Sequence, residues 1–319
     1  MKKIVTLFLS LSLVFAVGCG NVSATSIRFG SAAVGGMYSA FANAYTQIVS
    51  QDDESLQFSV RSTAGSAANI RLLSDGYIQM AIAQMDLTND AYERTGIFEN
   101  EKKHGGYSAV AALYTEACQV VVRADSGINT IEDLQDKRVS VGEEESGTEQ
   151  NAKQILAVYG LNDSLVDEVN LDYTNAAQEL KAGTIDAFFC TAGAQTTAIG
   201  ELAKKCDIRL LNIDEKSADK LKRTYKFYTN CTIPKETYQG QTEDIQTVGV
   251  KAVLLASDKL SADTVKDITK ILFKNKEELQ YSLPVDISID EKTAVEGVTI
   301  PFHKGAAAYY EECGINIAD

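Results

Sequence analysis

The chain has 319 residues, with 30 Lys or Arg against 44 Asp or Glu, so its formal net charge at neutral pH is −14. This acidic balance, without any run of basic residues, argues against a nucleic-acid-binding protein and against a protein held on an anionic membrane by its own charge. It does not decide the charge of a ligand, because an anion site can lie inside an acidic surface.

The first 24 residues have the parts of a secretory signal peptide. Lys2 and Lys3 are followed by the apolar segment 4–17, which is too short for a membrane span, and then by small residues. Two cleavage sites compete. Cleavage before Cys19 would make Cys19 the lipidated N-terminus of a lipoprotein, and cleavage after Val22-Ser23-Ala24 would use ordinary signal peptidase. The first site is slightly favoured, and either one predicts an exported protein.

The first part of the mature chain predicts alternating strands and helices. We expect strands at 27–30, 56–61, 79–84 and 108–114, and helices at 37–50, 66–75 and 87–95. The helix 37–50 carries Phe41, Tyr45 and Ile48 at helical spacing and follows a glycine-rich turn. Residues 99–106, rich in Glu, Lys and Gly, predict a mobile surface loop.

A buried strand from Cys118 to Arg123 is expected to cross into a second lobe, which would run to about residue 230. There we expect strands at 138–142 and 185–189, a helix after Ser146, a helix ending at Gly183, and a short helix after the capping-box spacing of residues 130–133. The chain would then return through a strand at 247–256, one long amphipathic helix at 261–279 and a last helix near 303–312, both helices packing on the first lobe.

One unit occurs twice in this order. The turns Gly35-Gly36-Met37-Tyr38 and Ser146-Gly147-Thr148 each open a helix, whose first N–H groups have no acceptor within the helix and can bind a carboxylate or phosphate. The loops Gln84-Met85-Asp86 and Thr191-Ala192-Gly193 would lie at the same edge of their sheets, where ligands of open parallel sheets bind. Any one of these loops could be an ordinary turn, since such turns also need Gly and Ser. The matching order of all four loops is what predicts two α/β lobes around a small anion.

The motifs of common enzymes are missing from the sequence, which has no G-x-S-x-G elbow, Walker loop or H-E-x-x-H helix. Glu143-Glu144-Glu145 could supply paired carboxylates, but adjacent loop residues do not converge on one substrate atom, so we expect them to be solvated. His104 and His303 are expected at a surface loop and a helix cap. We therefore expect no enzyme and no cofactor.

Five cysteines follow Cys19, none of them in a C-x-x-C pair, which argues against a zinc site. Cys118 and Cys190 lie in apolar strands and are expected in the core. Cys206 could form a disulfide with Cys231, because an exported chain permits one.

Several motifs together resemble the TAXI family of solute-binding proteins, which serve tripartite ATP-independent periplasmic (TRAP) transporters. They are Gly35-Gly36-Met37-Tyr38, Ser62-Thr63-Ala64-Gly65-Ser66, Gln84-Met85-Asp86 and Ser146-Gly147-Thr148, together with residues 67–73, 122–128, 133–142, 183–189 and 238–241. The resemblance covers nearly the whole mature chain, and it rests on the order and spacing of the motifs.

The resemblance implies a type II periplasmic-binding-protein fold, α/β, with two lobes joined by a strand hinge. Residues 25–115 plus 250–319 would form the first lobe and residues 116–249 the second. The lobes would close on a small solute, mainly glutamate, glutamine or a related carboxylate, and present it to a membrane permease driven by an ion gradient. We expect a monomer whose membrane contact, beyond that permease, is limited to its lipid.

The expected ligand-binding residues are Gly36, Met37, Tyr38, Thr63, Gly65, Ser66, Asn69, Gln84, Asp86, Glu116, Ser146, Gly147, Thr148 and Gly193. Glu116, just before the crossover strand, would either receive a ligand ammonium or be a solvated hinge residue. Ser146 would bind ligand, cap its helix with Glu149 at capping-box spacing, or do both.

Two departures from the family pattern bear on specificity. Met37 stands where Thr is usual and Met85 where Ser is usual, so either a contact is lost there or the ligand is less polar. The triplet 143–145 replaces the proline that usually precedes Ser146, which weakens the prediction of a strict carboxylate ligand. A sensor or adhesin of the same fold without a transporter remains the alternative. A sugar or dipeptide receptor would want tryptophans for stacking, and the chain has none.

Overall fold

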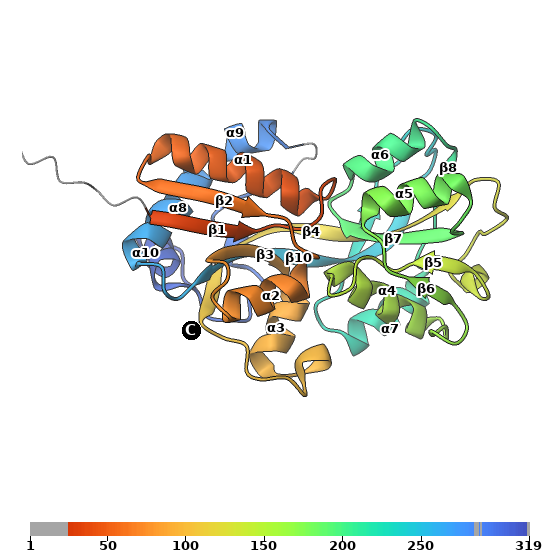
Figure 1. Ribbon diagram of the computed structural model, residues 1–319, viewed down its shortest axis with the longest axis horizontal. Coiled ribbons are helices and arrows are strands. Elements are labelled where there is room, and N and C mark those ends of the chain that lie inside the picture. The colour runs from red at the N-terminus through yellow and green to blue at the C-terminus, as the bar shows by residue number, and fades with distance from the viewer. Residues whose placement is uncertain (1–24, 284–286, 288, 318–319) are drawn as a thin grey trace, which may run out of the picture.

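The computed structural model describes residues 25–283, 287 and 289–317. The leader, both cleavage sites and Cys19 lie outside the described residues. Figure 1 shows two α/β lobes side by side, joined by two long strands. One ten-stranded sheet runs through both lobes in the order β2-β1-β3-β10-β4-β7-β5-β6, with β8 on β4 and β9 on β10.

The first lobe is built on three parallel strands next to one end of the two long strands. Its strands are β1 (Thr25–Gly30), β2 (Leu56–Arg61) and β3 (Met80–Gln84), and its helices are α1 (Met37–Asp52), α2 (Ser66–Ser74), α3 (Met85–Glu93), α8 (Ala262–Lys274), α9 (Lys276–Tyr281) and α10 (Lys304–Glu312). One buried apolar cluster lies between the sheet and α1, α8 and α10, around Phe29, Tyr45 and Tyr310. A second lies on the side of α2 and α3, around Ile70 and Phe98.

The second lobe repeats this plan with a parallel β6-β5-β7 unit. Its strands are β5 (Arg138–Ser140), β6 (Asp167–Val169), β7 (Ala187–Ala192), β8 (Ile208–Leu210) and β9 (Thr229–Ile233), and its helices are α4 (Gly147–Val158), α5 (Tyr173–Ala182), α6 (Thr197–Ala203) and α7 (Glu215–Thr224). Two further apolar clusters occupy its two faces. The sequence analysis did not predict β6, β8, β9, α6 or α7, which are short or strongly polar.

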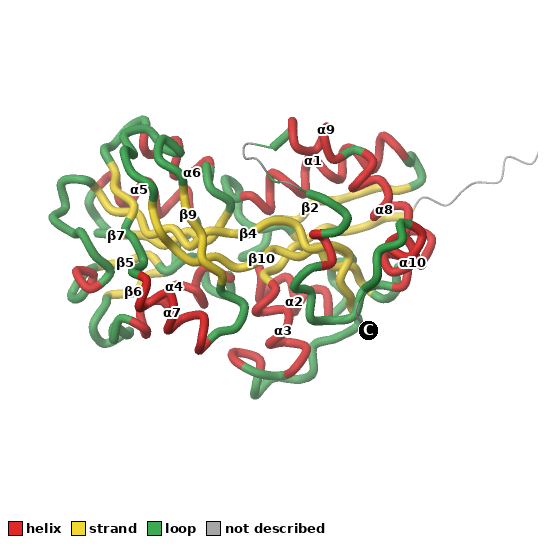
Figure 2. Tube along the Cα trace, turned by 180° about the vertical axis from the view of Figure 1, so that it is seen from behind, coloured by secondary structure: helices red, strands yellow, loops and turns green. Residues whose placement is uncertain are grey.

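The two long strands are β4 (Tyr107–Arg123) and β10 (Ile245–Ser257), which pair antiparallel along the middle of the molecule (Figure 2). The expected strands 108–114 and 118–123 are thus one strand, because the side chains between them stay buried apart from Thr115. Glu116 lies within this strand and pairs with Val250. The expected lobe boundaries, 115/116 and 249/250, fall at this pair and remain a prediction.

Two other expectations are corrected. The helix expected at 261–279 is broken at Asn275, whose backbone leaves the helical region while its side-chain amide donates to the Ile271 carbonyl at 3.1 Å. The short helix after residue 130 is a single 3-10 turn, Glu132–Leu134, where the Asp133 carboxylate accepts the backbone N–H groups of residues 129 and 130. Further 3-10 turns lie at Gly96–Phe98 and Thr293–Val295.

The cysteines bear out one expectation and not the other. Cys118 and Cys190 are buried in β4 and β7, as predicted. Cys206 and Cys231 are free thiols, so the suggested disulfide is absent. Cys231 pairs on β9 with Thr247 of β10, whereas Cys206 follows α6, and each packs separately at the edge of the same apolar cluster. In the part of the chain described, no helix is long and apolar enough to cross a membrane.

Candidate functional site

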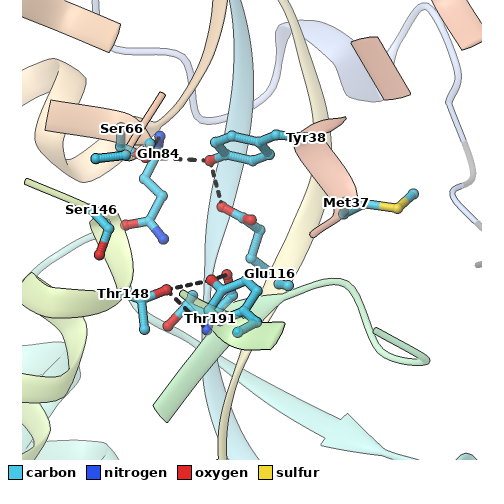
Figure 3. A pocket seen from close by; sticks show the side chains of 13 residues that line it. Met37, Tyr38, Ser66, Gln84, Glu116, Ser146, Thr148 and Thr191 are labelled. Carbon is cyan, nitrogen blue, oxygen red and sulfur yellow. Dashed lines mark hydrogen bonds between the residues drawn. The ribbon is translucent and has the colours of Figure 1, made fainter. Parts of the chain in front are cut away.

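A small polar cavity lies between the lobes, where α1, α2, β3, β4, α4 and β7 meet (Figure 3). It is lined by Met37, Tyr38, Ala64, Gly65, Ser66, Gln84, Glu116, Ser146, Gly147, Thr148, Tyr173, Thr191 and Ala192. Its volume is about 40 Å³, on a scale on which one water needs roughly 10–15 Å³. The lobes are therefore closed around a space for a few waters, and a solute must enter through a more open state.

Glu116 forms the base of the cavity and is 2% exposed, so it is not the solvated hinge residue that was one expectation. The Tyr38 hydroxyl donates to its Oε2 at 2.8 Å. Burial raises the pKa of Glu116 to about 8, and the nearby Asp86 acts in the same direction, whereas the bond from Tyr38 and the Gln84 side chain oppose them. A carboxyl with this environment is an acceptor for a cation or, when neutral, a hydrogen-bond donor.

The first-lobe loops are tied together beside Glu116. Ser66 Oγ lies 3.4 Å from the Tyr38 hydroxyl and accepts the Gln84 N–H at 3.0 Å, which links α2, α1 and β3. The Gln84 side chain reaches across to the second lobe, because a Cβ on Gly147 would lie only 2.3 Å from its Cδ and Oε1. Gln84 Oε1 is buried with no hydrogen-bond partner, so a second acceptor is available beside Glu116.

The second-lobe wall is held by hydroxyl groups that already have protein partners. Ser146 Oγ accepts the Glu149 N–H at 3.0 Å, so Ser146 caps α4 as one reading predicted. Thr148 Oγ1 lies 2.5 Å from the Tyr173 hydroxyl and accepts the Thr191 N–H at 3.2 Å. What this wall can offer a ligand is chiefly the N–H groups of the first turn of α4.

Tyr173 is a lining residue that the sequence analysis missed. It is the first residue of α5, and Asp172 caps that helix by accepting the N–H groups of residues 174 and 175. The Tyr173 hydroxyl also donates to the Thr191 carbonyl at 3.0 Å. Treating Asp172 as a helix cap would have placed Tyr173 in the first turn of α5, at the end of the helix that faces the cavity.

Five of the expected residues lie outside the cavity lining, and their part in ligand binding remains a prediction. Asn69 donates to the carbonyls of residues 31 and 82 at 2.7 and 2.8 Å and accepts the Thr63 hydroxyl at 2.8 Å, so both residues brace the loops. The Gly193 carbonyl accepts the hydroxyl of residue 196. Gly36 packs on the ring of the tyrosine at 173. Asp86 is buried beneath the site.

Asp86 forms a contact between the lobes. Its Oδ2 lies 3.4 Å from the side-chain amide of Asn151 on α4, while Asp86 Oδ1 and Asn151 Oδ1 are buried without partners. Burial raises the pKa of Asp86 to about 6. Asn151 also donates to the Tyr228 hydroxyl at 2.9 Å.

The two methionines that depart from the family pattern belong to the apolar clusters of the first lobe. Met37 is 5% and Met85 1% exposed. In Figure 3 the Met37 side chain points away from Glu116, so it brings its backbone rather than its thioether to the cavity. Neither methionine therefore adds an apolar surface beside Glu116.

A second set of contacts joins the lobes outside the cavity. The carbonyl of Glu145 accepts the N–H groups of Ala67 and Ala68, at 3.1 and 3.2 Å, in the first turn of α2. Its carboxylate pairs with Arg71 at 3.2 Å. We call these contacts the α2 latch. The side chains of Glu144 and Glu145 are exposed, as expected, and Glu145 in addition contacts the first lobe.

Arg71 is braced from its own lobe. It forms an ion pair with Glu101 at 2.6 Å and lies 5.0 Å from the centre of the Phe98 ring. This pairing lowers the pKa of Glu101 to about 2. His104 Nε2 lies 2.8 Å from Glu101 Oε2, and His104 is 2% exposed, so its expected place at the surface is wrong. His303 caps α10 by accepting a backbone N–H, as predicted.

The charge of the cavity is unusual for an anion site. Glu116 is the only acidic residue that lines it, and Lys, Arg and His are absent from its described lining. An anion would have to rely on helix-terminal N–H groups, and a cation would meet Glu116. The residues that the structure describes contain no group of three His, Cys, Asp or Glu placed to hold a metal ion.

Comparison with known proteins agrees with this architecture. A family model described as the NMT1-like family matches residues 29–314. The chain belongs to this family. Among solved structures, it is similar to a protein of Bordetella bronchiseptica RB50, with a TM-score of 0.55, 15% identity and coverage of 91% of this chain and 83% of the other.

Two further structures carry binding functions in their names. A putative L-cystine ABC transporter from Listeria monocytogenes matches with a TM-score of 0.54 and 14% identity, over 83% of this chain and 99% of that one. An ancestral arginine-binding protein bound to arginine matches with a TM-score of 0.50 and 16% identity, over 82% and 97%. At such identity these likenesses show the fold alone. It is the two-lobe α/β fold of type II periplasmic binding proteins, as expected.

Proposed function

We propose that this member of the NMT1-like family is an exported solute receptor. It captures a small carboxylate-bearing solute, such as glutamate, glutamine or a related acid, between its lobes and delivers it to a TRAP-type secondary transporter. The observation that carries the proposal is the polar cavity between two closed lobes, with helix starts on both sides and Glu116 at its base.

The two kinds of polar group in the cavity match the two ends of an amino acid. The first N–H groups of α1 and α4 can receive a carboxylate, because they have no acceptor within their helices. Glu116 and Gln84 Oε1 can receive an ammonium.

Delivery to a TRAP permease is supported by the resemblance of the motifs, and export and lipid anchoring by the leader. Mass spectrometry of the solute carried by purified protein, followed by isothermal titration with that solute, tests the receptor. Uptake by cells with and without the chain tests delivery. Tight binding without loss of uptake in the deletion strain would favour the sensor or adhesin alternative. Steady turnover of a bound solute would overturn the receptor.

The anchor has its own test. If Cys19 is lipidated, Cys19→Ser should move the protein from the membrane fraction to the soluble fraction. A mature wild-type N-terminus at Thr25 would show that the other cleavage site is used. Neither result bears on the cavity, so the lipid anchor and the solute-binding function can fail separately.

A further inference from the structure

The carboxyl of Glu116 has no positively charged neighbour to compensate it. It lies at the base of a cavity whose described lining contains no Lys, Arg or His, and it is 2% exposed. Tyr38 donates a hydrogen bond to it, and the Gln84 side chain also favours its charged form. Removing a carboxylate from water without a counter-ion costs more than these two neutral donors return, so the group takes up a proton instead.

Given the receptor function proposed above, we infer that Glu116 is protonated in the empty protein and releases this proton to solvent when a ligand ammonium binds beside it. The only covalent change is loss of the Glu116 O–H proton. The carboxylic acid and the free ammonium ligand become a carboxylate–ammonium ion pair plus one solvated proton. The ligand keeps its own protons, and its ammonium supplies the missing counter-charge.

The ionisable groups around Glu116 reinforce this state. Asp86 on α3 disfavours a second negative charge, and burial of Glu116 itself is the larger effect, giving a pKa of about 8. The remaining ionisable neighbours are neutral near pH 7, because burial raises the pKa of each. They are Tyr38 on α1, Tyr114 and Cys118 on β4, Tyr173 on α5 and Cys190 on β7.

Under this inference, Glu116 is the group that titrates, and the ligand's amine, rather than its carboxylate, makes binding depend on pH. An acid without an amine, such as glutarate, would leave Glu116 protonated and exchange no proton. An amino acid would bind more tightly as pH rises, since less work is then needed to remove the proton. With the pKa of Glu116 at about 8, its affinity should increase about 15-fold between pH 6.5 and 8. This range stays above the pKa of Asp86, about 6.

The experiment is isothermal titration of the full mature chain with L-glutamate, L-glutamine and glutarate. Running each titration at pH 7 in phosphate and in Tris, whose ionisation enthalpies differ, counts the protons exchanged. We expect release of about one proton with an amino acid and none with glutarate. Binding of an amino acid with no proton released, or with a proton taken up, would overturn the inference.

Two variants separate this role of Glu116 from a structural one. Glu116→Gln keeps the shape but cannot ionise, so it should lose both proton release and the pH dependence. Tyr38→Phe removes the bond that favours the carboxylate, so the midpoint of the pH profile should move upward. As a control, Glu144→Gln removes an exposed carboxylate of the second lobe and should match the wild type. Circular dichroism and thermal melting confirm that each variant folds.

Other results of these titrations would separate failure of this inference from failure of the receptor function. A pH profile in Glu116→Gln equal to that of the wild type would overturn the inference and leave the receptor function standing. An equal pH dependence of affinity for glutarate and for the amino acids would do the same. If none of these small acids binds, the carboxylate-solute receptor proposed for this cavity fails, and this inference falls with it.

Discussion

The helices α2 and α4 both begin at the seam between the lobes, but their first turns meet different partners. At α2, the N–H groups of Ala67 and Ala68 donate to a carbonyl of the opposite lobe. At α4, Ser146 of the same lobe caps the helix, and Gly147 and Thr148 face the cavity. Both helices thus present a positive N-terminal end at the seam. The end of α2 binds a carbonyl of the chain itself, and under our proposal the end of α4 binds a ligand.

This difference divides closure into two parts. The α2 latch forms from groups that the protein always carries, so it can close the lobes without solute. The cavity wall at α4 gains its partner only when an anion is present. A receptor built in this way should visit the closed state when empty and be held there by solute. The predictions below test each part, from the largest expected effect to the smallest.

The largest effect is expected at the α4 wall. Ser146→Ala with Thr148→Val removes the two hydroxyls that hold the first turn of α4 in place at the cavity, and solute affinity should fall by about one to three orders of magnitude at roughly 0.5–3 kcal/mol per hydrogen bond. Because Ser146 caps α4 and Thr148 bonds Tyr173, stability should also fall, by about 1–3 kcal/mol. Isothermal titration and thermal melting measure the two effects. Unchanged affinity in a folded double variant would show that solute binding does not depend on how these hydroxyls hold the wall.

The buried contact between Asp86 and Asn151 should make stability depend on pH. The folded-state pKa of Asp86 is raised to about 6, so its charged form is penalised, and the penalty is lifted as pH falls through 6. Asp86→Asn should therefore stabilise the empty protein at pH 7, by up to about 3 kcal/mol, and have little effect at pH 4. Thermal melting at both values checks this. Asp90→Asn on the same helix should give a smaller gain, because burial also raises the pKa of the half-buried Asp90 carboxyl. A loss of stability at pH 7 in Asp86→Asn would contradict the prediction.

Gly147 should be needed for the cavity rather than for α4 itself. A Cβ there would collide with the Gln84 amide, which would have to swing into the solute space. Gly147→Ala should lower solute affinity by about 5- to 150-fold, the equivalent of 1–3 kcal/mol of overpacking. Gly160→Ala is not a matched control, because Gly160 has a positive φ. Gly200→Ala is better, since Gly200 lies in α6 with open space around it. Equal effects of both changes would exclude a specific role for Gly147.

The smallest effect is expected at the α2 latch. Arg71→Met removes the ion pair with Glu145 but keeps much of the apolar stem, and the pair is partly exposed. Such pairs contribute about 0.2–1 kcal/mol, so affinity should fall only about two- to five-fold. Small-angle scattering of the empty protein should show a more open average shape. Glu145→Gln should reproduce the opening, and identical scattering curves for both variants and the wild type would rule out a role for the ion pair in the latch, since the backbone bonds of Glu145 remain in both variants.

Local signals in the chain accounted for much of the fold. The alternation of strands and helices, the starts of α1, α2 and α4, and the caps at Ser146 and His303 were all predictable. They depend on apolar spacing and hydrogen bonds within a few residues, which act wherever the segment finally lies. Apolar spacing alone predicted one continuous helix over 261–279. It could not predict that Asn275 would end α8 and separate it from α9.

The site could be predicted only as a set of loops. Nine of the fourteen expected residues line the cavity, because the ends of parallel strands must meet at one edge of the sheet. The helix cap at Asp172 could have revealed Tyr173, but nothing local indicated that it would bond Thr148 across 25 positions. The role of Asn69 could not be predicted from the sequence either, since a buried amide can hold a ligand or brace a loop.

By itself, the sequence determined that two similar α/β lobes would present helix starts to one another. Only the tertiary structure decided what each group at that seam meets. Tyr38 and Glu116 are 78 positions apart in the chain, and Glu145 joins a helix of the other lobe. Whether a carboxyl there is charged, and whether a helix end is occupied, depends on which distant groups exclude water around it. That exclusion follows from the packing of whole lobes, which no short segment contains.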